Sequence, residues 1–309
     1  RIIFDRLGYR DVEIVSPSND NAYEDLSGGH GNRFRLAALR GIVAIDLLRK
    51  LKQEQKPYEQ NPGDTDAVYD RSLKQVITAT EQGGKDLPNV LRACAEEFSA
   101  IKRRDIPRKP VVAVVGEIFM RDNPFCSNFL VDRLEALGAE TFMAPFREWL
   151  IYSQYRYWRD SMWKLDIKGL FKSKLQNTVA HMTLSGLDKA LEGYADMDKE
   201  VELEEMLGLC GPYVHKDYDG DPALNLGTCV KLYEEGVSGI ANILPFTCMP
   251  GTLVTALSES FRKDHENIPW VNIAYDGQDG AGIETRLQAF MHQVKEFARK
   301  KGYTDTPVT

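Results

Sequence analysis

The sequence lacks several features that would place it in a specialised class of protein. It has no apolar run close to the ~20 residues that cross a bilayer, so we expect no contact with a membrane. The five histidines are scattered and form no ligand pair, and the chain contains no Walker A or His-Glu-x-x-His sequence. A net charge of −7 gives no long-range attraction for phosphate backbones. These absences argue against membrane proteins, nucleic-acid binding and nucleotide hydrolysis through these motifs.

Cysteine is also scarce, with five residues at wide spacings: Cys94, Cys126, Cys210, Cys229 and Cys248. An odd number of thiols in a chain of this size does not suggest a disulfide framework. No apolar segment typical of a secretory signal precedes the first structured residues, so we expect a cytoplasmic protein. The first residue is Arg1 rather than Met, and Ile2-Ile3-Phe4 is typical of the interior of a folded segment. We therefore also expect a fragment of a longer protein.

The length of 309 residues predicts about two domains. A basic segment with two prolines, 103–110, is typical of a connection between them. We therefore predict an N-terminal α/β-helical domain over residues 1–109, truncated at its start. It contains a short strand over 12–15, turn-forming residues over 16–21, and helices over 33–51 and 64–101.

Residues 110–309 predict a flavodoxin-like α/β domain. Buried strands are expected at 111–115, 140–143, 239–244 and 270–275, with helices between them and a helical insertion at about 149–210. Strands that alternate with helices in this way predict a doubly wound parallel sheet of the flavodoxin or Rossmann type. Functional sites of such sheets lie beyond the carboxyl ends of the strands.

The strongest candidate site is the segment Pro245–Gly251, which contains Cys248 and joins a predicted strand to a predicted helix. Unpaired backbone N–H groups and the positive end of the helix dipole favour a thiolate there, the form that binds metal or attacks an electrophile. The alternative is an inert cysteine that packs in an ordinary strand-to-helix turn.

A second candidate, Gly116–Asn128, follows another predicted strand at the same level. Glu117 and Arg121 could contact a polar ligand, Cys126 could face the first thiol across the crevice, and Ser127 or its neighbour could cap the next helix. The alternative is that Glu117 and Arg121 form a structural ion pair while Cys126 packs.

Two other patterns favour structural explanations. Asp217, Asp219 and Asp221 resemble the start of a calcium loop, but Pro222 and Thr228 stand where that loop requires Gly and Glu, so a solvated turn is the better account. The aromatic residues of the insertion are more typical of a core or domain interface than of a surface for planar ligands. They are Trp149, Tyr152, Tyr155, Tyr157, Trp158 and Trp163.

The segment Val114–Phe125, with Leu134–Glu140 and Ala144-Pro145 behind it, resembles the 2-hydroxyacyl-CoA dehydratase and benzoyl-CoA reductase family. The string Gly236–Gly251 is similar to the C-terminal signature of that family, and the resemblance covers roughly residues 111 to 297. The N-terminal segments 16–21 and 41–46 resemble the activase-related branch, in which such a module ends very long proteins.

The resemblance implies low-potential electron transfer for (R)-2-hydroxyacyl-CoA dehydration or acyl-CoA reduction in an anaerobe. Members of the family hold a [4Fe-4S] cluster between two flavodoxin-like domains, and an ATP-dependent activase supplies the electron. By resemblance Cys248 is a cluster ligand and Cys126 is a second candidate, while further ligands lie upstream in the intact protein. A dehydratase or activase protein, missing upstream domains and acyl-CoA are the implied partners. The alternative is a docking, regulatory or small-molecule-binding module without a cluster, and whether the chain is itself a lyase stays open.

Overall fold

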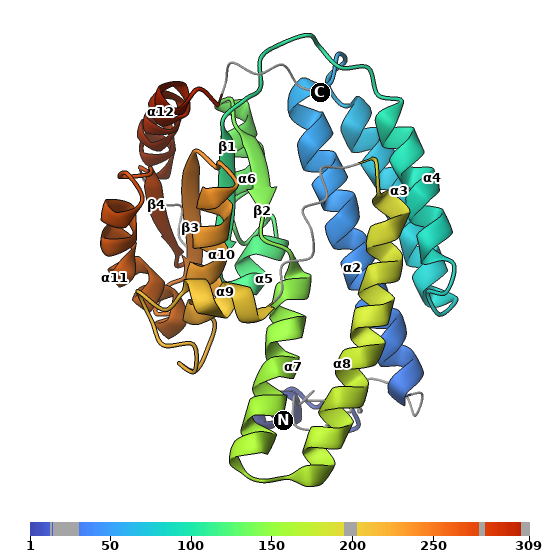
Figure 1. The fold of residues 1–309 in the computed structure, drawn as a ribbon. Coiled ribbons are helices and arrows are strands. Elements are labelled where there is room, and N and C mark those ends of the chain that lie inside the picture. Colours follow the sequence, from blue (N-terminus) through green and yellow to red (C-terminus); the bar gives the residue numbers. More distant parts are fainter. Residues whose placement is uncertain (13, 15–30, 195–202, 278–281, 304–309) are drawn as a thin grey trace.

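The chain folds around one four-stranded parallel sheet (Figure 1). The computed structural model describes residues 1–12, 14, 31–194, 203–277 and 282–303. Within them the strands stand in the order β2-β1-β3-β4, with every pairing parallel. This is the flavodoxin-like order, so the predicted fold class is confirmed. The strands are β1 (Val111–Gly116), β2 (Glu140–Met143), β3 (Gly239–Pro245) and β4 (Trp270–Tyr275).

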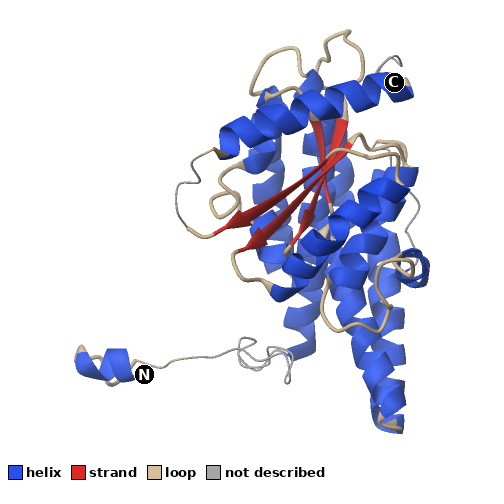
Figure 2. Ribbon diagram, turned by 90° about the vertical axis from the view of Figure 1, so that its left-hand side faces the viewer, coloured by secondary structure: helices blue, strands red, loops and turns tan. Residues whose placement is uncertain are grey.

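Helices cover both faces of the sheet, as Figure 2 shows, because the strands are apolar on both sides. Val112 and Val114 of β1 belong to the buried cluster on one face, while Ala113 and Val115 belong to the cluster on the other. The first face is covered by α5 (Ile118–Asp122), α6 (Leu130–Ala136) and α12 (Ile283–Lys301). The second is covered by α9 (Leu203–Leu209), α10 (Pro222–Glu234) and α11 (Met249–Asp264).

A layer of long helices stands beside the sheet. It contains α2 (Gly31–Gln55), α3 (Asp64–Glu81) and α4 (Leu87–Ser99), and the paired helices α7 (Phe146–Trp163) and α8 (Ile167–Asp188) extend from it. Leu184, Leu187 and Leu191 share one buried cluster with α2, α3 and α4. Helix α8 of the predicted insertion therefore packs on the N-terminal helices.

Several local predictions differ from the structure. The stretch 64–101 is two helices rather than one, because Gly83 and Gly84 adopt positive φ angles of 96° and 68° between them. The segment that directly follows Glu117 forms the short helix α5, which the sequence analysis did not predict. The expected strand at 12–15 includes Glu13 and Val15, which lie outside the described residues, as do the turn-forming residues 16–21.

At the N-terminus, no residue of helix α1 (Ile2–Arg6) is buried. Among the residues that the structure describes, no helix has both the length and the apolar character needed to cross a membrane.

Candidate functional site: the switch-point crevice and the junction cavity

The carboxyl ends of β1 and β3 are a topological switch point. From β1 the chain turns to α5 on one face of the sheet, and from β3 it turns to α11 on the other, which opens a crevice between neighbouring strands. Gly116 ends β1 with a φ of 114°, and a Cβ added there would lie 2.0 Å from the carbonyl oxygen of Ile243. Only glycine permits this approach of the two backbones. The floor of the crevice is therefore fixed by close backbone packing.

Cys248 lies at this crevice as the N-cap residue of α11, which confirms its predicted place between a buried strand and a helix. Its side chain is partly exposed. The Cys248 amide donates to the carbonyl of Pro245 (3.0 Å), and Thr252 Oγ1 donates to the carbonyl of Cys248 (2.7 Å). Thr247 has a φ of 67°, which is strained for a β-branched residue. The thiol is thus presented from a tightly constrained turn.

Exposed apolar side chains gather on the two segments that follow β1 and β3. Phe246 and Met249 flank Cys248 and are 66% and 62% exposed. Phe119, Phe125 and Phe129, on the segment after β1, are 60%, 81% and 51% exposed. We call these five residues the apolar rim. Grouped large apolar residues at a surface are typical of a protein interaction site.

In the second candidate segment, Gly116–Asn128, the polar side chains mainly stabilise the backbone of the segment itself. The Glu117 carboxylate accepts hydrogen bonds from the amides of Phe119 (3.2 Å) and Met120 (2.9 Å) and so caps α5. It is not joined to Arg121 by any salt bridge in the described structure. Cys126 is partly buried against the cluster beneath α12.

The predicted capping of α6 by Ser127 or Asn128 is wrong. Phe129 is the N-cap residue, with a φ of 53° and no side-chain cap. Ser127 Oγ instead donates to the carbonyls of Asn123 (3.1 Å) and Pro124 (3.3 Å). The turn before α6 bends back on itself, so its polar side chains bond to their own backbone rather than to the helix.

The thiols divide into two groups. Cys94, Cys210 and Cys229 are buried, and burial raises the pKa of each. Cys126 and Cys248 are partly exposed, on segments that lead to opposite faces of the sheet. Within the described ranges no three His, Cys, Asp or Glu side chains are placed to hold a metal ion. Because a [4Fe-4S] cluster takes four thiolates, these residues do not form a complete cluster site.

Arg121 is the most deeply buried charged residue at the crevice, with 7% of its surface exposed. One guanidinium nitrogen donates to the carbonyl of Ala144, and Nε has no hydrogen-bond partner. Burial lowers the pKa of Arg121, while Glu148 opposes this effect. A cavity of about 20 Å³ lies beside it, lined also by Asp221 and Thr228, and has room for one water molecule.

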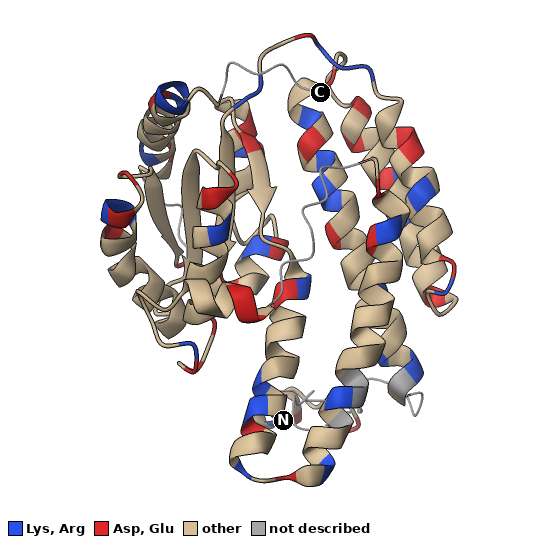
Figure 3. Cartoon of the chain, viewed as in Figure 1, with Lys and Arg blue, Asp and Glu red and all other residues tan. Residues whose placement is uncertain are grey.

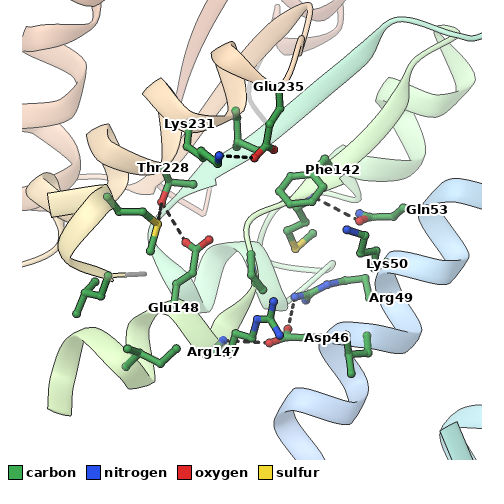
Figure 4. A pocket seen from close by; sticks show the side chains of 17 residues that line it. Asp46, Arg49, Lys50, Gln53, Phe142, Arg147, Glu148, Thr228, Lys231 and Glu235 are labelled. Atoms are coloured by element: carbon green, nitrogen blue, oxygen red, sulfur yellow. Dashed lines mark hydrogen bonds and ion pairs between the residues drawn. The ribbon is translucent and has the colours of Figure 1, made fainter. Parts of the chain in front are cut away.

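A larger cavity of about 100 Å³, which we call the junction cavity, lies where α2 meets the end of β2 and helices α7, α9 and α10 (Figure 4). Sequence analysis missed it because its residues come from five separate segments. The only sequence signal is Asp46, an acidic residue within the dense apolar pattern of α2. Both basic and acidic residues lie along the part of α2 beside the sheet, as Figure 3 shows.

Asp46 joins the helical layer to the sheet. Its carboxylate accepts from the amides of Phe146 (3.2 Å) and Arg147 (3.0 Å), so a residue of α2 caps the first turn of α7. Arg49 pairs with Asp46 at 2.5 Å and with Asp122 of α5. Burial raises the pKa of Asp46, and the charge of Arg49 opposes that effect. This chain of charges connects the junction cavity to the crevice.

Other residues singled out from the sequence have structural roles. Asp219 is exposed and pairs with Arg156 (3.0 Å) and Arg159 (3.1 Å), in agreement with a solvated turn. Tyr152 is buried in the core, and its hydroxyl donates to the carbonyl of Gly220 (2.6 Å).

Comparisons with protein-family models, with curated proteins and with solved structures find no match for this chain.

Proposed function

We propose that this chain is a dehydratase-like electron-transfer module of an activase-related protein, in which Cys248 contributes one ligand to an iron–sulfur cluster shared with a second surface. The observation that carries the proposal is the placement of Cys248. It is a partly exposed thiol at a helix N-terminus, at the switch point of a flavodoxin-like sheet. Sites of such folds lie at this point, and the start of a helix favours a thiolate.

The shared arrangement is part of the proposal because the described residues offer too few ligands. Three of the five thiols are buried within cores, which leaves Cys126 and Cys248 at the carboxyl edge. The apolar rim supports a second surface at this place, since a cluster is shielded from water when two apolar walls close over it. Upstream domains of the intact protein or a dehydratase partner would supply that surface and the remaining thiolates. Low-potential electron transfer for (R)-2-hydroxyacyl-CoA dehydration or related acyl-CoA reduction is the activity we propose for the assembled protein.

Anaerobic purification of the full-length protein, followed by iron and sulfide analysis, tests this proposal. We expect iron and sulfide in the wild type and their loss in Cys248→Ser. Cys210→Ser is the matched control, because it removes a thiol that is buried and hydrogen-bonded to the carbonyl of Leu207. It should keep its iron. A wild type without iron, or a Cys248→Ser variant with unchanged iron, contradicts the ligand assignment.

The second candidate is a docking, regulatory or small-molecule-binding module without a cluster. It is favoured by the missing third ligand among the residues that the structure describes. In that case the anaerobic protein holds no iron, and stabilisation by a bound small molecule persists in Cys248→Ala.

A further inference from the structure

Large apolar side chains are exposed where α7 turns into α8. Figure 1 and Figure 2 show that this end of the helical hairpin projects beyond the sheet. The exposed residues on the turn and its flanking helix ends are Met162 (44%), Trp163 (62%), Leu165 (83%), Ile167 (80%) and Phe171 (75%). None of the five belongs to a buried apolar cluster of the described structure. A contiguous exposed group of this kind is typical of an interaction site.

The turn that carries these side chains is tightly bonded. The Asp166 amide donates to the carbonyl of Ser161 (2.9 Å), and Asp166 Oδ1 accepts from the amide of Gly169 (3.0 Å) and so caps α8. Leu165 has a φ of 55°, in the left-handed region that is unfavourable for leucine. The turn therefore holds an apolar side chain in solvent from a strained backbone, a combination typical of functional positions.

The same end of the hairpin is basic, although the chain as a whole has a net charge of −7. Residues 162–174 include four lysines and one aspartate, the capping residue Asp166. Lys164, Lys168 and Lys174 are exposed, and among the residues that the structure describes no ion pair joins them to a carboxylate. Figure 3 shows basic residues on both sides of the turn. We call these three lysines and the five exposed apolar residues the hairpin tip.

This composition fits an anionic lipid surface better than a protein partner. Lysine is depleted in protein interfaces, and contact between two copies of the hairpin tip would bring like charges together. Tryptophan and lysine beside large apolar residues are instead typical of segments that lie at the interface of a bilayer. Along α8, Lys174 lies roughly 10 Å beyond Ile167, which matches the ~5–10 Å depth of interfacial insertion.

We propose that the hairpin tip binds the surface of a bilayer that contains anionic lipids. Leu165, Ile167 and Phe171 enter the boundary between headgroups and acyl chains, and the lysines contact the anionic headgroups. From the sequence we expected no contact with a membrane, because the chain lacks an apolar run long enough to span one. Insertion of a hairpin tip needs no such run.

Flotation of the full-length protein with lipid vesicles tests the proposal. One set of vesicles contains equal parts of phosphatidylcholine and phosphatidylserine, and the other contains phosphatidylcholine alone. We expect the protein to float with the mixed vesicles, to bind the neutral vesicles at least tenfold more weakly, and to dissociate as the salt concentration rises. No binding to the mixed vesicles, or equal binding to the two sets, overturns the proposal.

Variants locate the contact on the protein. The double variant Leu165→Ser with Phe171→Ser should weaken vesicle binding about tenfold or more, because it removes two inserted apolar side chains. Phe125→Ser is the matched control, since this phenylalanine of the apolar rim is 81% exposed, and it should bind as the wild type does. A loss in Phe125→Ser equal to that in the double variant would place the contact at the apolar rim and overturn the proposal.

The lysines are tested in the same way. Lys164→Gln with Lys168→Gln should weaken binding to the mixed vesicles roughly tenfold or more, because each lysine contributes ~1 kcal/mol near an anionic surface. Lys74→Gln with Lys263→Gln removes two exposed lysines of other helices and should change the affinity less than about threefold. Equal losses in the two double variants would mean that only the overall charge attracts the protein, which contradicts a specific role of the hairpin tip.

Sedimentation of the same proteins distinguishes the alternative, a second copy of the chain on the hairpin tip. Self-association that disappears in Leu165→Ser with Phe171→Ser, in a protein that does not float with vesicles, would overturn the proposal in favour of a dimer. The inference is independent of the proposed cluster, because Cys248 lies on a different segment. Cys248→Ser should therefore lose its iron and still float as the wild type does.

Discussion

The switch-point crevice and the junction cavity are built in opposite ways. The crevice is formed by two short continuous segments that follow β1 and β3, and it presents Cys248 and the apolar rim at the surface. The junction cavity is formed by side chains from five segments, among them the Glu148 carboxylate, which accepts a hydrogen bond from Thr228. Backbone geometry fixes the first site, whereas paired charges between helices fix the second. The two sites should therefore respond differently to changes in sterics and in charge.

The largest expected effect is that of Gly116→Ala at the floor of the crevice. The added Cβ would lie 2.0 Å from the carbonyl oxygen of Ile243, at a φ of 114°. Overpacking and backbone strain together should lower the free energy of unfolding by about 3–5 kcal/mol. Urea unfolding measures this loss. Gly186→Ala in α8 is the control, because no atom lies within 4 Å of its added Cβ, and it should be neutral or stabilising. A loss below about 1 kcal/mol for Gly116→Ala would show that the two strands have room to separate.

Asp46→Ala tests the charged connection at the junction cavity. It leaves the first amides of α7 uncapped and Arg49 with only Asp122, so the free energy of unfolding should fall by about 3 kcal/mol. Asp66→Ala removes an exposed partner of Lys52 and should cost less than about 1 kcal/mol. Equal losses in the two variants, measured by urea unfolding, would contradict a special role for Asp46.

Glu148→Gln should remove a pH-dependent contribution of the Glu148 carboxyl to the stability of the protein. Burial raises the pKa of Glu148 above its ordinary value of 4.5, although Arg121 opposes the shift. The folded wild type therefore holds the proton more tightly than the unfolded chain, and it loses stability as the pH rises from 4.5 through the raised pKa. Glutamine does not titrate. The unfolding temperature of the variant should thus rise relative to that of the wild type over this range and then stay level. A relative advantage that shrinks with rising pH would contradict a raised pKa for this buried carboxyl.

The smallest expected effect is that of Thr247→Gly, next to Cys248. Glycine relieves the strain of a φ of 67°, so the free energy of unfolding should rise by roughly 0.5–1 kcal/mol. Thr252→Gly, inside α11, should instead lose about 1 kcal/mol, because glycine is unfavourable in a helix. If Thr247→Gly also destabilises the protein, the turn before Cys248 is not strained.

Sequence patterns predicted the sheet well because its strands are short apolar runs buried on both faces. The predicted bounds of β2 and β4 agree with the structure, and β1 and β3 each extend one residue further. The place of Cys248 followed from the same pattern. Helix α5 was missed because one turn is too short for an apolar period to emerge, and a left-handed Phe129 at the start of α6 has no sequence signature.

The junction cavity was beyond the reach of sequence patterns for a different reason. Asp46 and the amides of Phe146 and Arg147 are about one hundred positions apart, and their contact depends on how α2 packs against α7. Glu148 lies within an aromatic helix, where its neighbours predict only burial. Local periodicity carries no information on which charges meet across helices.

The most direct test of the central claim is the alkylation of Cys248 before and after cluster reconstitution. The full-length protein is treated with iodoacetamide under anaerobic conditions, and modified peptides are quantified by mass spectrometry. We expect Cys248 to be labelled much faster than the buried Cys94, Cys210 and Cys229 in the iron-free protein, and to be protected once iron and sulfide are bound. Labelling of Cys248 at the same rate in the two forms would contradict its role as a cluster ligand.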